Sequence, residues 1–291
     1  MILNTNAQAL LANNALWHRN NALAKASTNL SAGTKINKSG DDPTGMAVSN
    51  KMRLQIKGIE MADRNVNDAV SLIQTAEASV GEMQNIAQRM RELSIQASTG
   101  VLTADDRRLI QQEIEQLSEE LDSISERTEF NKKCLLNDDY EEFTFHTGND
   151  YRDNLTVSFK AINAEVLGLS TKRAPEYDDN GNPLPGGAMI DGLDYTTVDG
   201  AQEALERCDK ALNRINSYRA NLGANQNRLE KTSSSLVISE ESTHAALSRV
   251  LDTDMAGEMS EYTKNNVLVQ AGISMLSQAN QRPNQLLSLL Q

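Results

Sequence analysis

Residues 42–99 read DPTGMAVSNKMRLQIKGIEMADRNVNDAVSLIQTAEASVGEMQNIAQRMRELSIQAST, and their apolar positions predict one unbroken helix. From Met52 to Met90 these positions alternate steps of four and three residues, with only Asp63 and Glu77 out of pattern. A period of 3.5 is typical of a helix packed lengthwise against other helices. At about 1.5 Å per residue the helix is on the order of 80 Å long. The stretch therefore predicts an elongated protein with a mechanical or assembly role.

The composition agrees with bundled helices. The chain has 291 residues, of which 39% are hydrophobic, 4% are aromatic and five are proline. This suits a helical bundle better than a β-sandwich or a large α/β core. The net charge of −12 and the absence of a basic patch argue against nucleic acid as a partner. Two cysteines without a CxxC motif argue against a disulfide scaffold or a zinc site.

Membrane and targeting signals are missing from the sequence. No apolar run approaches the roughly 18 residues of a membrane span, so we expect no membrane partner. The N-terminus has no Lys or Arg before Arg19, and polar residues interrupt its apolar ones, which argues against a cleaved signal peptide. These observations alone favour a cytoplasmic location.

Both ends of the chain carry a long apolar seam at helical spacing. One helix is predicted over residues 3–31 and another over the last segment, where Pro283 should kink or end it. Such a helix either packs on the protein's own core or needs a partner outside the subunit. Isolated helices are marginal in water, so we expect the ends to become ordered when many subunits stack. The seam residues are Leu3, Leu10, Leu16, Trp17, Leu23, Leu30, Leu268, Met275, Leu276, Ala279, Leu286 and Leu290.

Turn and cap signals divide the first half of the chain. Asp42 is a candidate N-cap with Pro43 at the first helical position, and Gly100 is expected to end the long helix as a C′ residue. Thr103 followed by Asp106 predicts a capping box that opens a third helix. The short link makes the second and third helices an antiparallel pair.

Beyond residue 130 the period changes to two. Alternation over 143–146 and 155–160 predicts a β-hairpin, and residues 174–199 are predicted to form surface turns with little regular structure. Helical spacing resumes at Ala201, with the polar residues Arg219, Gln226, Ser233 and Glu240 in seam positions. Polar residues weaken a seam but fix its register. The predicted fold class is mainly α: a long antiparallel helical bundle or coiled coil with a small β-hairpin region.

No constellation of residues predicts catalysis, a cofactor or a metal. The three histidines lie far apart in sequence on different predicted elements, and there is no HExxH motif. Residues 177–182 superficially resemble a calcium loop, but Pro183 stands where an EF-hand needs glycine, so a surface turn is favoured. A disulfide between Cys134 and Cys208 is possible but disfavoured, because nothing in the sequence places the two residues close together. We therefore expect a protein that is not an enzyme.

Several blocks of sequence resemble bacterial flagellin. They occur in the family's order and are specific, and the resemblance covers roughly residues 1–170 and 200–291. Residues 171–199 match nothing, and in this family that stretch is the variable outer one. The blocks are LSAGTKIN (30–37), DDPTGMAVS (41–49), RNVNDA (64–69), QTAE (74–77), QRMRELSIQ (88–96), LGANQNRL (222–229), SRVLDTDMA (248–256), QANQ (278–281) and LLSLL (286–290).

The resemblance implies a filament subunit that polymerises with copies of itself for motility. Its terminal helices would form an inner coiled-coil tube, and the other helices and the hairpin would form the next shell. Family members are exported unfolded through the flagellar secretion channel by an uncleaved signal, so the implied location is extracellular. The implied domains are 1–40 (inner coiled coil), 41–170 (helical bundle with hairpin), 171–199 (short variable segment), 200–250 (bundle helix) and 251–291 (inner coiled coil).

The resemblance also implies partners. These are the export apparatus and a secretion chaperone, the filament cap and hook-associated proteins, and an animal Toll-like receptor. The receptor contact corresponds to Arg89, Leu93 and Glu113, for which a solvated helix face is the plainer alternative. Within the superfamily a hook–filament junction protein shares the terminal seams. A cytoplasmic coiled-coil adaptor would explain the seams alone, but not the matching blocks.

Overall fold

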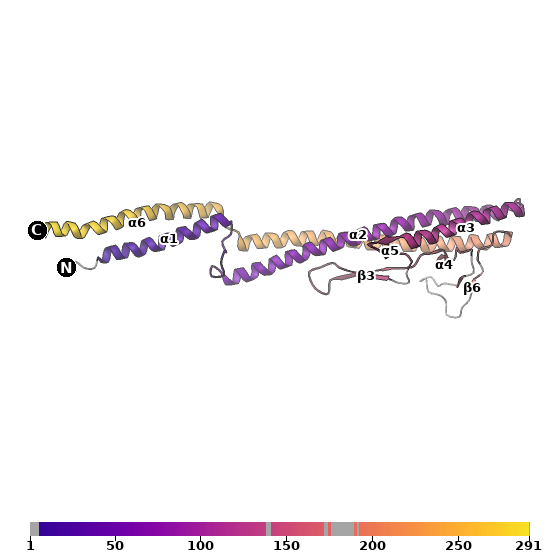
Figure 1. Cartoon of the computed structure of the whole chain (residues 1–291), viewed down its shortest axis with the longest axis horizontal. Helices are drawn as coiled ribbons and strands as arrows, with labels where there is room; N and C mark the ends of the chain where they lie inside the picture. Colours follow the sequence, from indigo (N-terminus) through magenta and orange to yellow (C-terminus); the bar gives the residue numbers. More distant parts are fainter. Residues whose placement is uncertain (1–5, 138–140, 172–173, 176–188, 191, 291) are drawn as a thin grey trace. The chain divides into compact units, whose positions relative to one another are not determined.

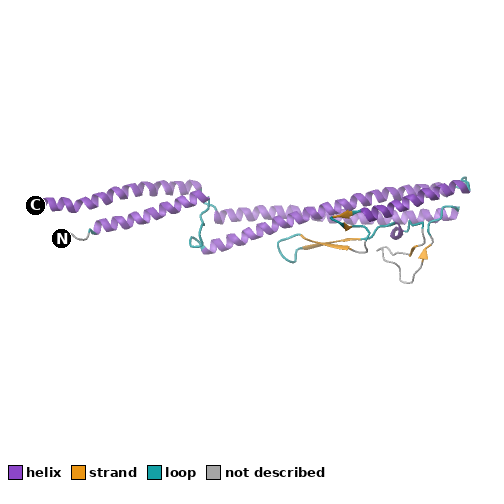
Figure 2. Ribbon diagram, viewed as in Figure 1, coloured by secondary structure: helices purple, strands orange, loops and turns teal. Residues whose placement is uncertain are grey.

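The computed structural model is mainly helical, as the sequence predicts (Figures 1 and 2). It describes residues 6–137, 141–171, 174–175, 189–190 and 192–290; of Glu141, 174–175, 189–190 and 283–290 it describes the backbone only. No helix among these residues is long and apolar enough to cross a lipid bilayer. The helices are α1 (Ala7–Ala32), α2 (Pro43–Ala97), α3 (Ala104–Arg127), α4 (Ala164–Leu167), α5 (Val198–Leu251) and α6 (Met255–Leu290). The strands are β1 (Glu129–Phe130), β2 (Lys133–Cys134), β3 (Glu141–His146), β4 (Asn154–Phe159), β5 (Ala174–Pro175) and β6 (Met189–Ile190).

The chain divides into two compact units. The terminal unit comprises residues 1–57 and 240–291, and the central unit comprises residues 58–239. The domain boundaries expected from sequence, near residues 40 and 250, stay predictions.

The core of the central unit is the apolar stripe of α2. Its predicted positions Val66, Ile73, Val80, Met83 and Met90 are all buried, as expected from the 3.5-residue period. Seam residues of α3 and α5, together with the inward side chains of β4, complete the same hydrophobic cluster. The long helix and its lengthwise packing are thus confirmed.

The two polar residues that interrupt the stripe of α2 face polar residues of α5. Asp63 accepts a hydrogen bond of 2.6 Å from the hydroxyl of Ser233. Glu77 forms an ion pair of 3.4 Å with Arg219, which also donates to Gln84 at 2.6 Å. Both pairings require the same antiparallel register of α2 against α5. The polar residues that interrupt the apolar seams of α2 and α5 therefore pair with each other.

The helix caps agree with the sequence except at one position. Asp42 Oδ1 accepts from the backbone N–H groups of Thr44 and Gly45, and Thr103 with Asp106 forms the predicted capping box. The prediction for Gly100 is wrong. Helix α2 ends at Ala97, and Gly100 is not among the described glycines with positive φ.

A side chain from α3 caps the C-terminus of α2 in place of Gly100. The guanidinium of Arg107 donates to the carbonyl oxygens of Ala97 and Thr99, each at 3.0 Å. The bond to Ala97 satisfies a carbonyl group of the last turn of α2, which a helix end leaves without a partner inside the helix. The tight left-handed turn that favours glycine is then not needed.

The predicted β-hairpin is confirmed. Strand β3 pairs antiparallel with β4, with Phe143 opposite Val157 and Phe145 opposite Leu155. The inward residues of β4 are buried in the core of the central unit.

The segment 174–199 is more ordered than predicted at its two ends. Strands β5 and β6 pair, with Ala174 opposite Ile190, and residues 176–188 between the strands lie outside the described part of the chain. Further on, Leu193 and Tyr195 are buried in the core, so surface turns are the wrong prediction there. Gln111 of α3 fixes them by accepting from the backbone N–H of Tyr195 at 2.9 Å and donating to the carbonyl of Leu193 at 3.3 Å.

In the terminal unit α1 and α6 lie side by side and antiparallel (Figure 1). The links that follow α1 and precede α6 also bond to each other. Gly33 ends α1 in the left-handed conformation with φ of 70°, and its carbonyl accepts from the N–H of Thr253 at 3.1 Å. The N–H of Lys35 donates to the carbonyl of Leu251 at 2.8 Å. Helix α6 does not end at Pro283, which was one of the two expectations for that position.

Candidate assembly surface

The pairing of α1 with α6 is held by a few polar contacts along its length. Asn6 Nδ2 donates to the carbonyl of Ala279 at 2.8 Å, and Asn29 Nδ2 donates to Glu258 Oε1 at 3.1 Å. Between them Leu16 lies against Gly272, where an added Cβ would come within 3.0 Å of Leu16 Cδ1. The glycine therefore lets the two helices approach closely at this point.

The pair buries very little of its surface. Among the described side chains of α1 and α6, only Ala26, Asn29 and Asn265 are buried. Asn265 Nδ2 donates to Glu261 Oε1 at 3.1 Å, while its Oδ1 has no hydrogen-bond partner among the described residues. A two-helix contact with so small a core, and with polar groups inside it, contributes little stability on its own.

The structure separates the predicted seam into two sets. The inner set is half-buried and consists of Leu16, Leu23, Leu30, Leu276 and Ala279. The outer set is exposed and consists of Leu10, Trp17, Leu268 and Met275. Trp17 is 63% exposed and Met275 is 60% exposed. Leu3 lies outside the described residues, and the side chains of Leu286 and Leu290 are not described.

Sequence reasoning missed further exposed apolar side chains beside the outer set. Leu11 on α1 and Val267 and Ile273 on α6 are more than half exposed. They lie off the 3.5-residue stripe, so the periodicity did not select them. Large contiguous exposed apolar areas mark interaction sites in soluble proteins. The outer set and these three neighbours are therefore the strongest candidate surface for assembly.

The second predicted site joins α2 to α3. Arg89 donates to Glu113 Oε1 through both Nε and Nη2, at 3.1 and 2.8 Å, and its Nη1 lies 3.3 Å from Glu92. The hydrogen bonds and charge of Glu113 raise the pKa of Arg89 above its ordinary value. Leu93 is only 2% exposed and packs in the core. The structure thus brings Arg89 and Glu113 together on the surface, whereas it buries Leu93 in the core.

Both cysteines are free thiols. Cys208 is buried on α5, with its Sγ 3.7 Å from Ser94 Oγ, and burial raises its pKa. A buried thiol of this kind behaves as a small hydrophobic side chain. Tyr195 completes the cluster with its hydroxyl 3.2 Å from Ser94 Oγ.

Comparison with known protein families finds a match over most of the chain. Residues 3–141 match the family model of the bacterial flagellin N-terminal helical region, and residues 205–290 match that of the C-terminal helical region.

The chain belongs to the bacterial flagellin family.

Its relatives are flagellins over their whole length. The chain is 43% identical to the flagellin of Bacillus subtilis (strain 168) over 303 residues, which covers 100% of each chain. It is 38% identical to flagellin FlaB2 of Treponema pallidum (strain Nichols) over 300 residues, again covering 100% of each. A solved Vibrio parahaemolyticus chain described as a flagellar hook-associated protein shares the fold, with a TM-score of 0.55. That chain is 11% identical, and the match covers 73% of this chain and 100% of that one.

Membership of the family decides between the functions considered from sequence. The protein is a flagellin, a structural subunit of the flagellar filament, and it is not an enzyme. The subunit polymerises with copies of itself, and the filament lies outside the cell. This replaces the cytoplasmic location that composition alone favoured.

Proposed function

We propose that this flagellin is exported unfolded and that it joins the filament through its terminal helices. The carrying observation is the outer set, in which Trp17 and Met275 leave well over half of their surface in water. Fully burying a large apolar side chain contributes about 1.5–3 kcal/mol. Packing of α1 and α6 against neighbouring subunits supplies that burial.

The small core of the α1–α6 pair fits the proposed export. A pair that buries three described side chains separates at little cost, so a chain with unfolded ends is easily reached before assembly. We expect residues 1–40 to be cut rapidly by protease in the monomer and to resist cutting in the filament. Equal resistance in the two states would contradict the proposal.

The outer set is tested by truncating side chains that are already exposed. Trp17→Ala/Met275→Ala should raise the critical concentration for polymerisation of purified monomer by at least about tenfold. Because neither side chain packs in the subunit core, the helix content of the monomer should stay unchanged. Tyr151→Ala removes an aromatic side chain of the β3–β4 loop that is even more exposed than Trp17, and it serves as the matched control. Polymerisation of the double variant at the wild-type concentration would overturn the proposal.

The same ends are the proposed contacts of the other partners. An export chaperone would cover the apolar face of α6 before assembly, and the export apparatus would take the unfolded N-terminus. The filament cap and hook-associated proteins would meet the terminal helices at the two ends of the polymer. Tested individually, the α6 variants Leu268→Ala and Met275→Ala should weaken chaperone binding to the monomer as well as polymerisation.

We also propose that an animal Toll-like receptor contacts this flagellin at Arg89, Leu93 and Glu113. Support comes from the exposure of Arg89 and Glu113 on adjacent helices. Leu93 is buried in the core, so its part in the contact is to hold α2 in place. Arg89→Ala should abolish signalling by the monomer, while Arg108→Ala on α3 should not. Unchanged signalling by the Arg89 variant would remove this site.

A further inference from the structure

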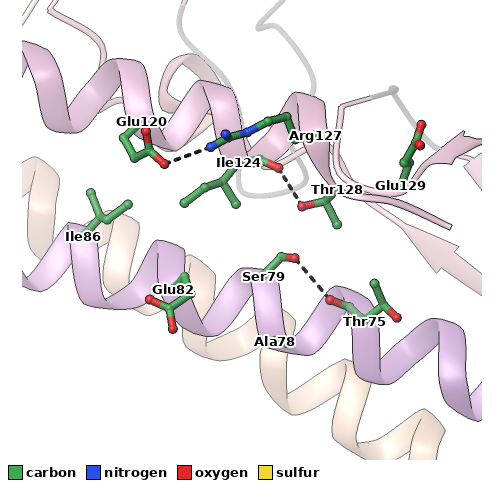
Figure 3. A pocket seen from close by; sticks show the side chains of 10 residues that line it. All are labelled: Thr75, Ala78, Ser79, Glu82, Ile86, Glu120, Ile124, Arg127, Thr128 and Glu129. Carbon is green, nitrogen blue, oxygen red and sulfur yellow. Dashed lines mark hydrogen bonds and ion pairs between the residues drawn. The ribbon is translucent and has the colours of Figure 1, made fainter.

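A groove lies between α2 and α3 in the central unit. It has a volume of about 700 Å³. Ile86 of α2 and Ile124 of α3 supply apolar lining, and three carboxylates also line it: Glu82, Glu120 and Glu129. Figure 3 shows the two helices facing each other across this space, with Glu82 on α2 and Glu120 on α3.

The groove carries excess negative charge. Arg127 compensates Glu120 through an ion pair of 3.0 Å. Neither Glu82 nor Glu129 forms an ion pair with any residue of the described ranges. Glu82 accepts a long hydrogen bond of 3.5 Å from Asn85 Nδ2. Two carboxylates beside an apolar floor fit an occupant that offers cations together with an apolar side chain.

The first part of α2, within the terminal unit, offers that combination. Arg53 and Lys57 are four residues apart, so they lie on one face of the helix, and Leu54 lies beside them. All three are exposed, and Leu54 is 71% exposed. In the part of the chain that the structure describes, neither cation has an ion-pair partner. We name these three residues the basic face.

We propose that the basic face of one subunit binds the acidic groove of a neighbouring subunit in the filament. A second copy of the chain is the occupant for two reasons. Each subunit carries a net charge of −12, so copies repel unless opposite charges meet locally at their contacts. The two surfaces are also different parts of the same chain, and a contact between unlike patches repeats from copy to copy without closing, which builds a filament.

This inference rests on polymerisation but not on the outer set of the terminal helices. A contact of this kind sets the orientation and the rate of subunit addition more than the total affinity. The groove contact is separate from the burial of Trp17 and Met275. In any filament formed by a variant with reversed charges in the groove, the chain ends should therefore stay protected from protease. Loss of the terminal contact, by contrast, should leave the ends exposed.

The test exchanges the charges of the two surfaces. Glu82→Lys/Glu129→Lys should raise the critical concentration for seeded polymerisation at least about tenfold, and Arg53→Glu/Lys57→Glu should do the same. The variant with all four substitutions should return to within about threefold of wild type, because the opposite charges then meet again with their positions exchanged. Circular dichroism of each monomer checks that the helices are intact.

A matched control separates the local contact from the change in net charge. Glu142→Lys/Glu241→Lys alters the net charge by the same amount at two exposed positions outside the groove, and it should polymerise as the wild type does. The proposal is overturned if the fourfold variant polymerises no better than either double variant. Wild-type polymerisation by the groove variant would overturn it as well. The neutral pair Glu82→Gln/Glu129→Gln should give an intermediate effect.

Discussion

Ser233 Oγ donates a 2.6 Å hydrogen bond to Asp63 Oδ1, joining α5 to α2 across 170 residues of sequence. A hydrogen bond to a charged group contributes about 1.5–3 kcal/mol when buried, and this one is partly exposed. We expect Ser233→Ala to lower the free energy of unfolding by about 1 kcal/mol in urea denaturation of the monomer. Ser234→Ala, which removes a hydroxyl bonded only within α5, should change it much less.

Two glycines of α2 should respond in opposite ways to alanine. At Gly58 an added Cβ would collide with the side chain of Asn149 in the β3–β4 loop, whereas at Gly81 it would meet open space. Gly58→Ala should displace the loop and speed hydrogen exchange in β3 and β4. Gly81→Ala should raise the free energy of unfolding by about 0.5–1 kcal/mol, since alanine is the better helix former. Unaltered exchange in the Gly58 variant would show that the loop is not held there.

Stability should fall in alkaline solution. Burial raises the pKa of both Tyr195 and Tyr218 above the ordinary value of 10.0. Above about pH 10 the unfolded chain ionises these phenols while the folded chain keeps them protonated, so rising pH favours unfolding. Each tyrosine contributes at most about 1.4 kcal/mol per pH unit to this slope. Tyr195→Phe should therefore flatten the pH dependence of urea unfolding between about pH 10 and 11, and an unchanged slope would contradict the assignment.

The N-terminus of α3 should weaken in acid. Hydrogen bonds from the hydroxyl and the backbone N–H of Thr103 hold the pKa of Asp106 below its ordinary value of 3.8. Its contribution to stability is complete above that value and is lost as the pH falls through the lowered pKa. Asp106→Asn should reduce the melting temperature at pH 7 and narrow the difference between pH 7 and pH 3. Asp105→Asn, one residue earlier and outside the capping box, is the control.

The lengthwise packing of α2 follows from sequence because a 3.5-residue period leaves one face to bury. Asp63 and Glu77 also indicate that polar pairs set the register of α2 against α5, because α5 carries polar residues at its own seam positions. What the sequence does not give is the partner of each marker. That depends on how far α5 slides along α2, which the observed pairs fix.

Single contacts between distant segments cannot be predicted from sequence periodicity. Leu193 and Tyr195 are two apolar residues in a polar stretch, too few to define a period, and the bonds of Tyr195 to Gln111 and Ser94 fix its place. Gly100 has the right residue type for a helix end, but Arg107 reaches the same carbonyl groups from α3. In both cases a side chain from another element overrides a local signal.

The terminal seam shows the same limit at the candidate assembly surface. Leu16 and Trp17 are neighbours in sequence and fall in adjacent columns of one apolar face. The pattern predicts that both columns are covered, but it cannot say which column faces the subunit's own partner helix. Contact with Gly272 places Leu16 inward and leaves Trp17 outward.

The pairing of Ala174 with Ile190 brings two distant points of the backbone to hydrogen-bonding distance. The stretch between them therefore begins and ends at the same place, whatever its length. We expect insertions and deletions between the two strands to leave the flanking chain unchanged, because the entropic cost of closing a loop rises only slowly with its length. A foreign peptide inserted after Pro175 should therefore leave β5 paired with β6 and the helices intact.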